Sequence, residues 1–215
     1  MTVVDWDWIS RNLGDILGYL GEHVVLTVVP LLAGALIAFP LALIAVRRPR
    51  LYGPLLGITG VMFTIPSLAL FMLLIPFTGL ARSTSFIGLT IYTLLILLRN
   101  TVEGLRGVPR EVREAAEAMG YGRARLLLTV ELPLALPVIV AGLRIAAVTT
   151  IGLVAVTALI GQGGFGQLML VGVNRFFPTP ILVGIAGSIL LAFATDVGLL
   201  AAQRALSPWT RRNAT

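Results

Sequence analysis

The sequence lacks cysteine and contains a single histidine, His23, so several kinds of chemistry are excluded at once. Without cysteine there can be no disulfide, no thiolate nucleophile and no thiolate metal ligand. One imidazole cannot provide a histidine cluster for a metal. Charge is scarce as well, since only 12% of the 215 residues are charged. A soluble globular domain has roughly 25% charged residues, and the sequence does not fit that class.

Apolar residues are abundant instead. They make up 57% of the chain, and the mean hydropathy is +0.96. We therefore expect lipid to be the solvent and one all-α membrane domain to fill residues 1–215, because the length leaves no room for a second globular unit. All sixteen basic residues are arginine, and the net charge is +6. They lie at the ends of apolar runs and form no basic stripe, which argues against nucleic-acid binding.

Five apolar runs are candidates for spans, each of which needs about 20 residues. They cover residues 24–46, 54–76, 83–98, 136–160 and 179–202, and the third is short. Pro30, Pro40 and Pro66 predict kinks inside them, which lipid tolerates only where neighbouring groups satisfy the freed carbonyls. Segment 1–22 does not have the pattern of a signal peptide. It is either an interfacial helix with two tryptophans or an extension of the first span.

The arginines predict the orientation of the spans, because cytoplasmic loops carry an excess of basic residues. With the N-terminus outside, the outer segments hold only Arg11, Arg82 and Arg175. The inner segments then hold Arg47, Arg48, Arg50, Arg99, Arg106, Arg110, Arg113, Arg123, Arg125, Arg204, Arg211 and Arg212. We expect an N-out, C-in chain with a cytoplasmic loop at 99–135 and a cytoplasmic tail at 203–215.

The polar loop predicts two short helices. Pro109 suits the first turn of the first helix, and Gly120 can end that helix in the left-handed conformation. A second helix is predicted over 123–130, stopping before Leu132–Pro133.

The first of these helices has two contrasting faces. One is apolar and consists of Val112, Ala115, Ala116 and Met119; the other is charged and consists of Arg110, Arg113, Glu114 and Glu117. A face of small residues with a charged rim favours docking into a groove on a partner. A helix resting on the bilayer usually has bulky apolar residues there.

The loop reads EAA, three residues, Gly120, ten residues through Val130, and then ELP. This resembles the EAA loop of ABC-importer permeases, in which isoleucine stands at the place of Val130. Further segments are similar to the permeases of osmoprotectant importers, which carry glycine betaine, carnitine and choline. They are TIPSLALF (64–71), LLRNTVEGLRGVP (97–109), VELPLALPVIVAGLR (130–144) and ALIGQGGFGQ (158–167). The methionine-importer permeases share the size, the five spans and the glycine-rich segment, and are the alternative.

The resemblance implies a division of labour among subunits. The residues that couple to an ATPase subunit would be Glu114, Ala115, Ala116, Glu117 and Gly120. ATP and Mg would be bound by that subunit, because this chain lacks a P-loop motif. We therefore expect no catalytic residue, no metal and no cofactor here. A second permease subunit, identical or different, would complete the pore in the inner membrane, and a separate extracytoplasmic binding protein would deliver the solute. A secondary transporter and a small channel are the alternatives from other classes.

Gly161, Gly163 and Gly166 match the dinucleotide fingerprint G-x-G-x-x-G. That motif must follow a strand and open a helix in a βαβ unit, whereas here it follows an apolar run. We interpret the segment as a tight turn with close backbone packing at the outer mouth, or as a plain re-entrant loop. His23, at the outer end of the first span, is predicted to be solvated.

Two charges, Arg144 and Asp196, lie inside apolar runs, where ionisable residues are functional hypotheses by default. The fourth and fifth spans run in opposite directions, which places both residues toward the cytoplasmic side. We expect them to pair, as a tie between helices in preference to a transport role. No carboxylate is expected at mid-membrane, so a quaternary amine would need aromatic faces or water.

Other polar groups in the spans are few. The candidates for lining the pathway are Thr64, Ser67, Tyr92, Thr149, Thr150 and Thr157. Most intramembrane threonines bond only to carbonyls of their own helix, which weakens the case for any single one.

Overall fold

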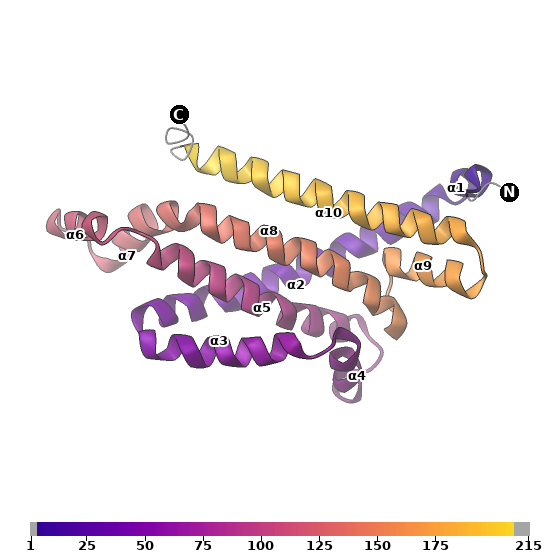
Figure 1. The fold of residues 1–215 in the computed structure, drawn as a ribbon, viewed down its shortest axis with the longest axis horizontal. Helices are drawn as coiled ribbons and strands as arrows, with labels where there is room; N and C mark the ends of the chain where they lie inside the picture. Colours follow the sequence, from indigo (N-terminus) through magenta and orange to yellow (C-terminus); the bar gives the residue numbers. More distant parts are fainter. Residues whose placement is uncertain (1–3, 209–215) are drawn as a thin grey trace.

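The computed structural model describes residues 4–208, which form a helical bundle (Figure 1). The predicted tail arginines Arg211 and Arg212 lie outside the described residues, as do residues 1–3 of the N-terminal segment and 209–215 of the tail. The helices in chain order are α1 (Trp6–Arg11), α2 (Leu13–Arg47), α3 (Pro49–Thr64), α4 (Ser67–Thr78), α5 (Arg82–Arg106), α6 (Arg110–Ala118), α7 (Arg123–Leu126), η1 (Leu127–Glu131), α8 (Leu132–Thr157), η2 (Ala158–Ile160), α9 (Phe165–Asn174) and α10 (Pro178–Leu206).

Four helical runs are long and apolar enough to cross a membrane: α2, α5, the run 123–160 that contains α8, and α10. The third span is longer than predicted, because its polar ends from Arg82 to Arg106 are helical too. Residues 13–22 are part of α2 and so extend the first span, whereas Trp6–Arg11 forms the separate helix α1.

The predicted span 54–76 is a broken one. It consists of α3 and α4, which meet at an angle of 96°. The break lies at Ile65–Pro66, where proline cannot donate a backbone hydrogen bond and forces the preceding residue into an extended conformation. Pro30 and Pro40, in contrast, lie within α2, which continues through both. Together, α3 and α4 make a fifth span at most.

The bundle is organised around α5, which packs against both α2 and α8. The α2 side of the main core is built from small residues, Ala38, Ala42 and Ala45, which lie against Leu98 and Val102 of α5. Small side chains let helix backbones approach closely, as is typical of packing between membrane helices.

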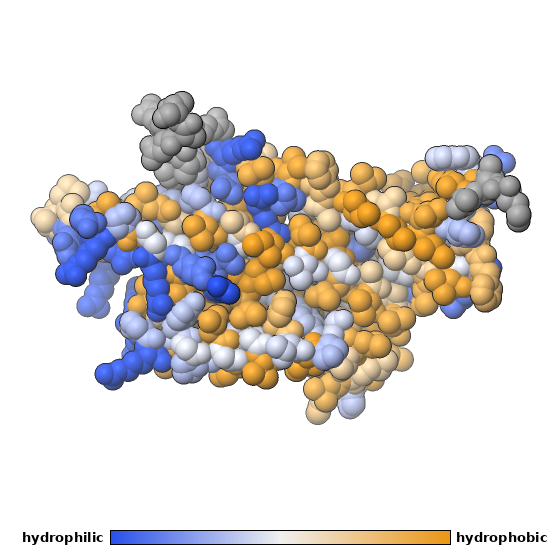
Figure 2. Space-filling view, viewed as in Figure 1, coloured by the Kyte–Doolittle hydropathy of each residue, from blue (hydrophilic) through white to orange (hydrophobic). Residues whose placement is uncertain are grey.

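The two ends of the bundle differ in composition. Helices α6 and α7 and the α2–α3 turn lie at one end, which Figure 2 shows to be hydrophilic, while α1 and α9 lie at the other (Figure 1). The side of the bundle is covered by apolar side chains. Those of α10 include Leu182, Ile185, Ile189, Leu190, Phe193 and Val197, all exposed. An apolar surface of this extent fits contact with lipid or with another membrane subunit.

Candidate functional site

Helix α6 ends as its local sequence predicts, but it begins one residue later than expected, because Pro109 has an extended ψ of 140° and stays outside the first turn. Pro109 precedes Arg110 as the N-cap residue. Gly120 adopts a φ of 82°. The N–H of Gly120 donates to the carbonyl of Glu117 (2.9 Å), and that of Tyr121 donates to the carbonyl of Ala116 (3.1 Å). These two bonds form a Schellman motif, so the length of the helix is fixed by its own sequence.

The apolar face of α6 is divided between two surroundings. Val112, Ala115 and Met119 are exposed, with Met119 at 69%. Ala116 is only 3% exposed, because it packs onto the rest of the chain. The prediction that all four share one free face is therefore wrong for Ala116, which lies at the edge of the stripe. What remains outside is a narrow apolar strip with no partner in the described chain.

The charged residues of α6 also differ in their surroundings. Glu114 accepts from Arg110 Nε at 2.6 Å, an exposed pair one turn apart, and Glu117 is exposed. Arg113 instead points inward, where its Nε lies 3.0 Å from Oε1 of Glu131 and its Nη2 donates to the carbonyl of Leu105. Both partners in this ion pair are largely buried. We call this set of contacts, which joins α6 to η1 and the end of α5, the Arg113 clamp.

The clamp meets a widened turn. Residues Leu127–Glu131 form a π-helix, in which the N–H of Leu132 donates to the carbonyl of Leu127. The helix predicted to stop before Leu132–Pro133 thus continues into α8, and that boundary is wrong. Pro133 is tolerated because proline fits the first turn of a helix segment. The wider π turn changes the backbone hydrogen-bond register of the helix just before Pro133. Such π turns are frequent at functional sites.

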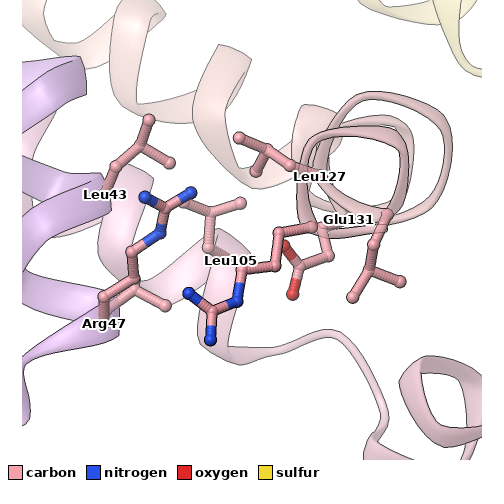
Figure 3. A pocket seen from close by; sticks show the side chains of 8 residues that line it. Leu43, Arg47, Leu105, Leu127 and Glu131 are labelled. Carbon is pink, nitrogen blue, oxygen red and sulfur yellow. The ribbon is translucent and has the colours of Figure 1, made fainter. Parts of the chain in front are cut away.

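A cavity of about 360 Å³ lies behind the clamp, between the end of α2, the end of α5 and the α7–η1 segment. Figure 3 shows Arg47 and Glu131 on two sides of the pocket, with the side chains of Leu43, Leu105 and Leu127 beside them. Arg47 forms no ion pair within residues 4–208. The cavity leaves η1, which carries Glu131 of the clamp, incompletely packed on its α2 side.

Arg144 and Asp196 lie side by side in the middle of the bundle. Arg144 Nε donates to Asp196 Oδ1 at 2.8 Å, and Nη2 donates to Oδ2 at 2.7 Å. At 1.5 Å per residue, Arg144 lies about 18 Å from the start of α8 and about 20 Å from its end. Because residues 123–131 continue into α8, Arg144 lies near the middle of the helical run 123–160. Its side chains remain 25% and 35% exposed.

Three of the predicted pathway residues meet at the break between α3 and α4. The hydroxyl of Tyr92 donates to the carbonyl of Ile65. Thr64 bonds to the carbonyl of Val61 at 2.7 Å, and Ser67 begins α4. Tyr92 thus satisfies a carbonyl that the break leaves free.

The other three pathway candidates lie on α8. Thr150 and Thr157 are buried and donate to the carbonyls of Ala146 and Val154, each at 2.7 Å. Thr149 differs, because its hydroxyl has no hydrogen bond to any described residue and lines a cavity with Arg144 and Asp196.

Residues 30–212 match the family of binding-protein-dependent transport system inner membrane components. The chain belongs to this family. It is therefore a permease component of the inner membrane, and its relatives are transport components rather than enzymes.

Individual relatives of this permease are similar over nearly its whole length. The choline transport system permease OpuBB of Bacillus subtilis is 34% identical and covers 94% of this chain and 93% of its own. The glycine betaine/carnitine/choline permease OpuCD of the same organism is 37% identical, over 93% of this chain and 87% of its own. The fold matches a chain of the inward-facing MetNI methionine ABC transporter, with a TM-score of 0.77, 23% identity, and coverage of 89% and 95%.

The glycine-rich turn of the permease is held by two residues that sequence reasoning misjudged or missed. His23 is fully buried rather than solvated, so that prediction is wrong. Its Nδ1 accepts from the N–H of Phe165 (3.2 Å), and its Nε2 lies 3.1 Å from the carbonyl of Ile151. Glu22 accepts from the N–H of Gly164 (3.2 Å). The turn folds back over α2, far away in sequence, which no local signal could reveal.

The same turn also opens a helix. Residues Phe165–Asn174 form α9, which was not predicted. Gly161 and Gly164 have φ values of 78° and 83°. The interpretation as a tight turn with close backbone packing fits this geometry.

Proposed function

We propose that this permease is the membrane subunit of an ATP-driven importer of quaternary-amine osmoprotectants such as glycine betaine, carnitine and choline. It would act with ABC ATPase subunits, a second permease subunit and an extracytoplasmic binding protein. ATP and Mg would be bound by the ATPase, and this chain would hydrolyse nothing itself. The solute class is supported by the two relatives described above.

The observation that carries the proposal is the form of α6. Its exposed strip of Val112, Ala115 and Met119 is apolar, yet it lies at the hydrophilic end of the molecule (Figure 2). A small apolar strip in a charged rim suits a groove on a partner protein. The Arg113 clamp then joins that docking helix to two spanning helices. A surface that only bound a partner, without transmitting its motion, would not require such a connection.

The mechanism would be alternating access. ATP would close the ATPase subunits, and their motion would pull α6. Through the Arg113 clamp this would displace η1 and α5, so that the bundle opens outward to the binding protein. Hydrolysis would return it to the inward-facing state. In this scheme the α6 end is cytoplasmic, and labelling of a cysteine introduced at Ala118 from outside intact cells would contradict it.

The docking role is tested by adding bulk to the exposed strip. Ala115→Trp should prevent entry into a groove and reduce co-purification of the ATPase and ATP-dependent uptake at least tenfold, the effect of about 1.4 kcal/mol. Glu114→Gln should reduce uptake less, since Glu114 already pairs with Arg110. The readouts are the amount of co-purified ATPase and the uptake of radiolabelled glycine betaine into proteoliposomes.

Ala205→Trp is the matched control, because Ala205 is exposed near the end of α10 at the same end of the bundle. It should bind the ATPase normally. If the Ala115→Trp protein retained full coupled uptake, α6 would not be the docking helix. Uptake of methionine by the native complex, with no uptake of the three quaternary amines, would instead favour the class suggested by the fold match.

A further inference from the structure

We propose that the Arg144–Asp196 pair, with the cavity beside it, forms a binding site for a zwitterion that carries a quaternary ammonium group. The inference rests on the proposed function, since it names where this chain would contact the transported solute. The site would lie between the two ends of the bundle, on the face shared by α8 and α10.

The pair is not sealed between its helices. Arg144 is 25% exposed and Asp196 35% exposed, although both lie within helical runs that are long and apolar enough to cross a membrane. Charged groups at such depth face the interior of a bundle or a water-filled cavity, not lipid. This face of α8 and α10 therefore borders a polar space in the assembled transporter, as a transport path would.

The pair also retains unused bonding capacity. Arg144 uses Nε and Nη2 to bind Asp196, while its Nη1 has no partner among residues 4–208. A guanidinium has five donors, and a carboxylate has about four acceptor positions. The two residues thus present a positive and a negative end, side by side, to the same cavity.

The cavity has a suitable size and a further polar group. Its volume is about 480 Å³, within the range of about 300–1,000 Å³ typical of small-molecule sites. Ala141, Ile145 and Val148 provide apolar walls. Thr149 contributes a hydroxyl that is not bonded to its own helix, in contrast to the neighbouring Thr150.

An aromatic residue lies one turn before the negative end, on the exposed surface outside the residues that line the cavity. Phe193 precedes Asp196 by three residues, so both lie on one face of α10, and Phe193 is 68% exposed. Aromatic faces attract quaternary ammonium groups. A ligand such as glycine betaine would place its ammonium group near Asp196 and Phe193 and its carboxylate near Arg144 Nη1 and the Thr149 hydroxyl. Choline has no carboxylate and would lose the second half of these contacts.

The test measures binding without the binding protein. The permease–ATPase complex in lipid nanodiscs is dialysed against radiolabelled glycine betaine or choline. Thr149→Val, which keeps the shape of the side chain, should weaken glycine betaine binding about three- to tenfold, as for one lost hydrogen bond, and choline binding less. Phe193→Leu should weaken the binding of both. Thr150→Val is the matched control and should change neither.

The exchange Arg144→Asp with Asp196→Arg separates a ligand site from a tie between helices. Restored assembly with the ATPase, without restored glycine betaine binding or uptake, supports the site. Full recovery of both would show that the pair only holds the helices together and would overturn the inference. So would a native complex that takes up glycine betaine but binds none. A native complex that takes up no osmoprotectant at all would contradict the proposed function itself.

Discussion

The two ends of the bundle are held together by different kinds of contact. At the α6 end, helix α6 is attached by the Arg113 clamp and the buried Ala116, beside a π-helix and a cavity. At the other end the turn over 161–166 is pressed against α2 and α8, with His23 fully buried beneath it. One end is joined by few polar contacts, and the other is packed backbone against side chain.

The difference indicates which end of the bundle can change its conformation more easily. Closely packed segments have few alternative arrangements, because any displacement leaves voids or clashes. Helix α6, which is held by few contacts next to an unfilled space, has several such arrangements. We therefore expect that changes in the glycine turn mainly reduce stability, whereas changes in the Arg113 clamp mainly reduce coupling.

The largest expected effect is in the packed end. In Gly166→Ala the new Cβ would lie 2.2 Å from the carbonyl oxygen of Ala155, so backbone must shift. Overpacking of this kind costs about 1–3 kcal/mol, occasionally more. We expect a clearly lower thermal unfolding temperature in detergent and little folded protein in the membrane.

Gly152→Ala is the control for that substitution, because it adds the same methyl group to α8 where no atom lies within 4 Å. Its stability should be unchanged or raised by up to about 1 kcal/mol from the better helix propensity of alanine. Equal stability of the Gly166→Ala and native proteins would show that the turn is not tightly packed.

The second-largest effect is expected in the Arg113 clamp, where a substitution should reduce uptake without preventing assembly with the ATPase. Arg113→Ala leaves Glu131 without its partner and frees α6 from the carbonyl of Leu105. We expect the ATPase to co-purify at the native level and to hydrolyse ATP, while glycine betaine uptake falls about tenfold, equivalent to about 1.4 kcal/mol. The measurement is the ratio of solute transported to ATP hydrolysed.

The exchange Arg113→Glu with Glu131→Arg is the companion variant. It restores opposite charges at the same two positions, and partial recovery of that ratio is expected. If Arg113→Ala lost ATPase binding and uptake together, the clamp would position the docking surface rather than transmit its motion.

The sequence was most informative where structure is local. The limits of α6 follow from Pro109 and Gly120, each of which acts through its own backbone preference.

The sequence failed where an outcome depends on distant segments. His23 is buried only because Phe165, more than a hundred residues away, returns to it. Similarly, Pro40 is accommodated within α2 while Pro66 breaks its span, although both stand in apolar runs. The candidate site also combines a feature that the sequence predicts with one that it does not. The positions of the residues in their spans predicted the Arg144–Asp196 pair, but the cavity beside the pair arises only from the packing.

The smallest effect concerns the ion pair at the packed end, Arg82–Glu22, at 3.2 Å with side chains 64% and 39% exposed. Glu22→Gln removes the charge but keeps an oxygen that can accept from the N–H of Gly164. Exposed pairs contribute about 0.2–1 kcal/mol, and salt screens them. A double-mutant cycle with Arg82→Gln, followed by thermal unfolding, should give a coupling energy in that range that declines in 0.5 M salt. A coupling energy well above that of Arg113–Glu131 would mean that charge, and not close packing, holds the glycine turn, and would reverse the contrast between the two ends.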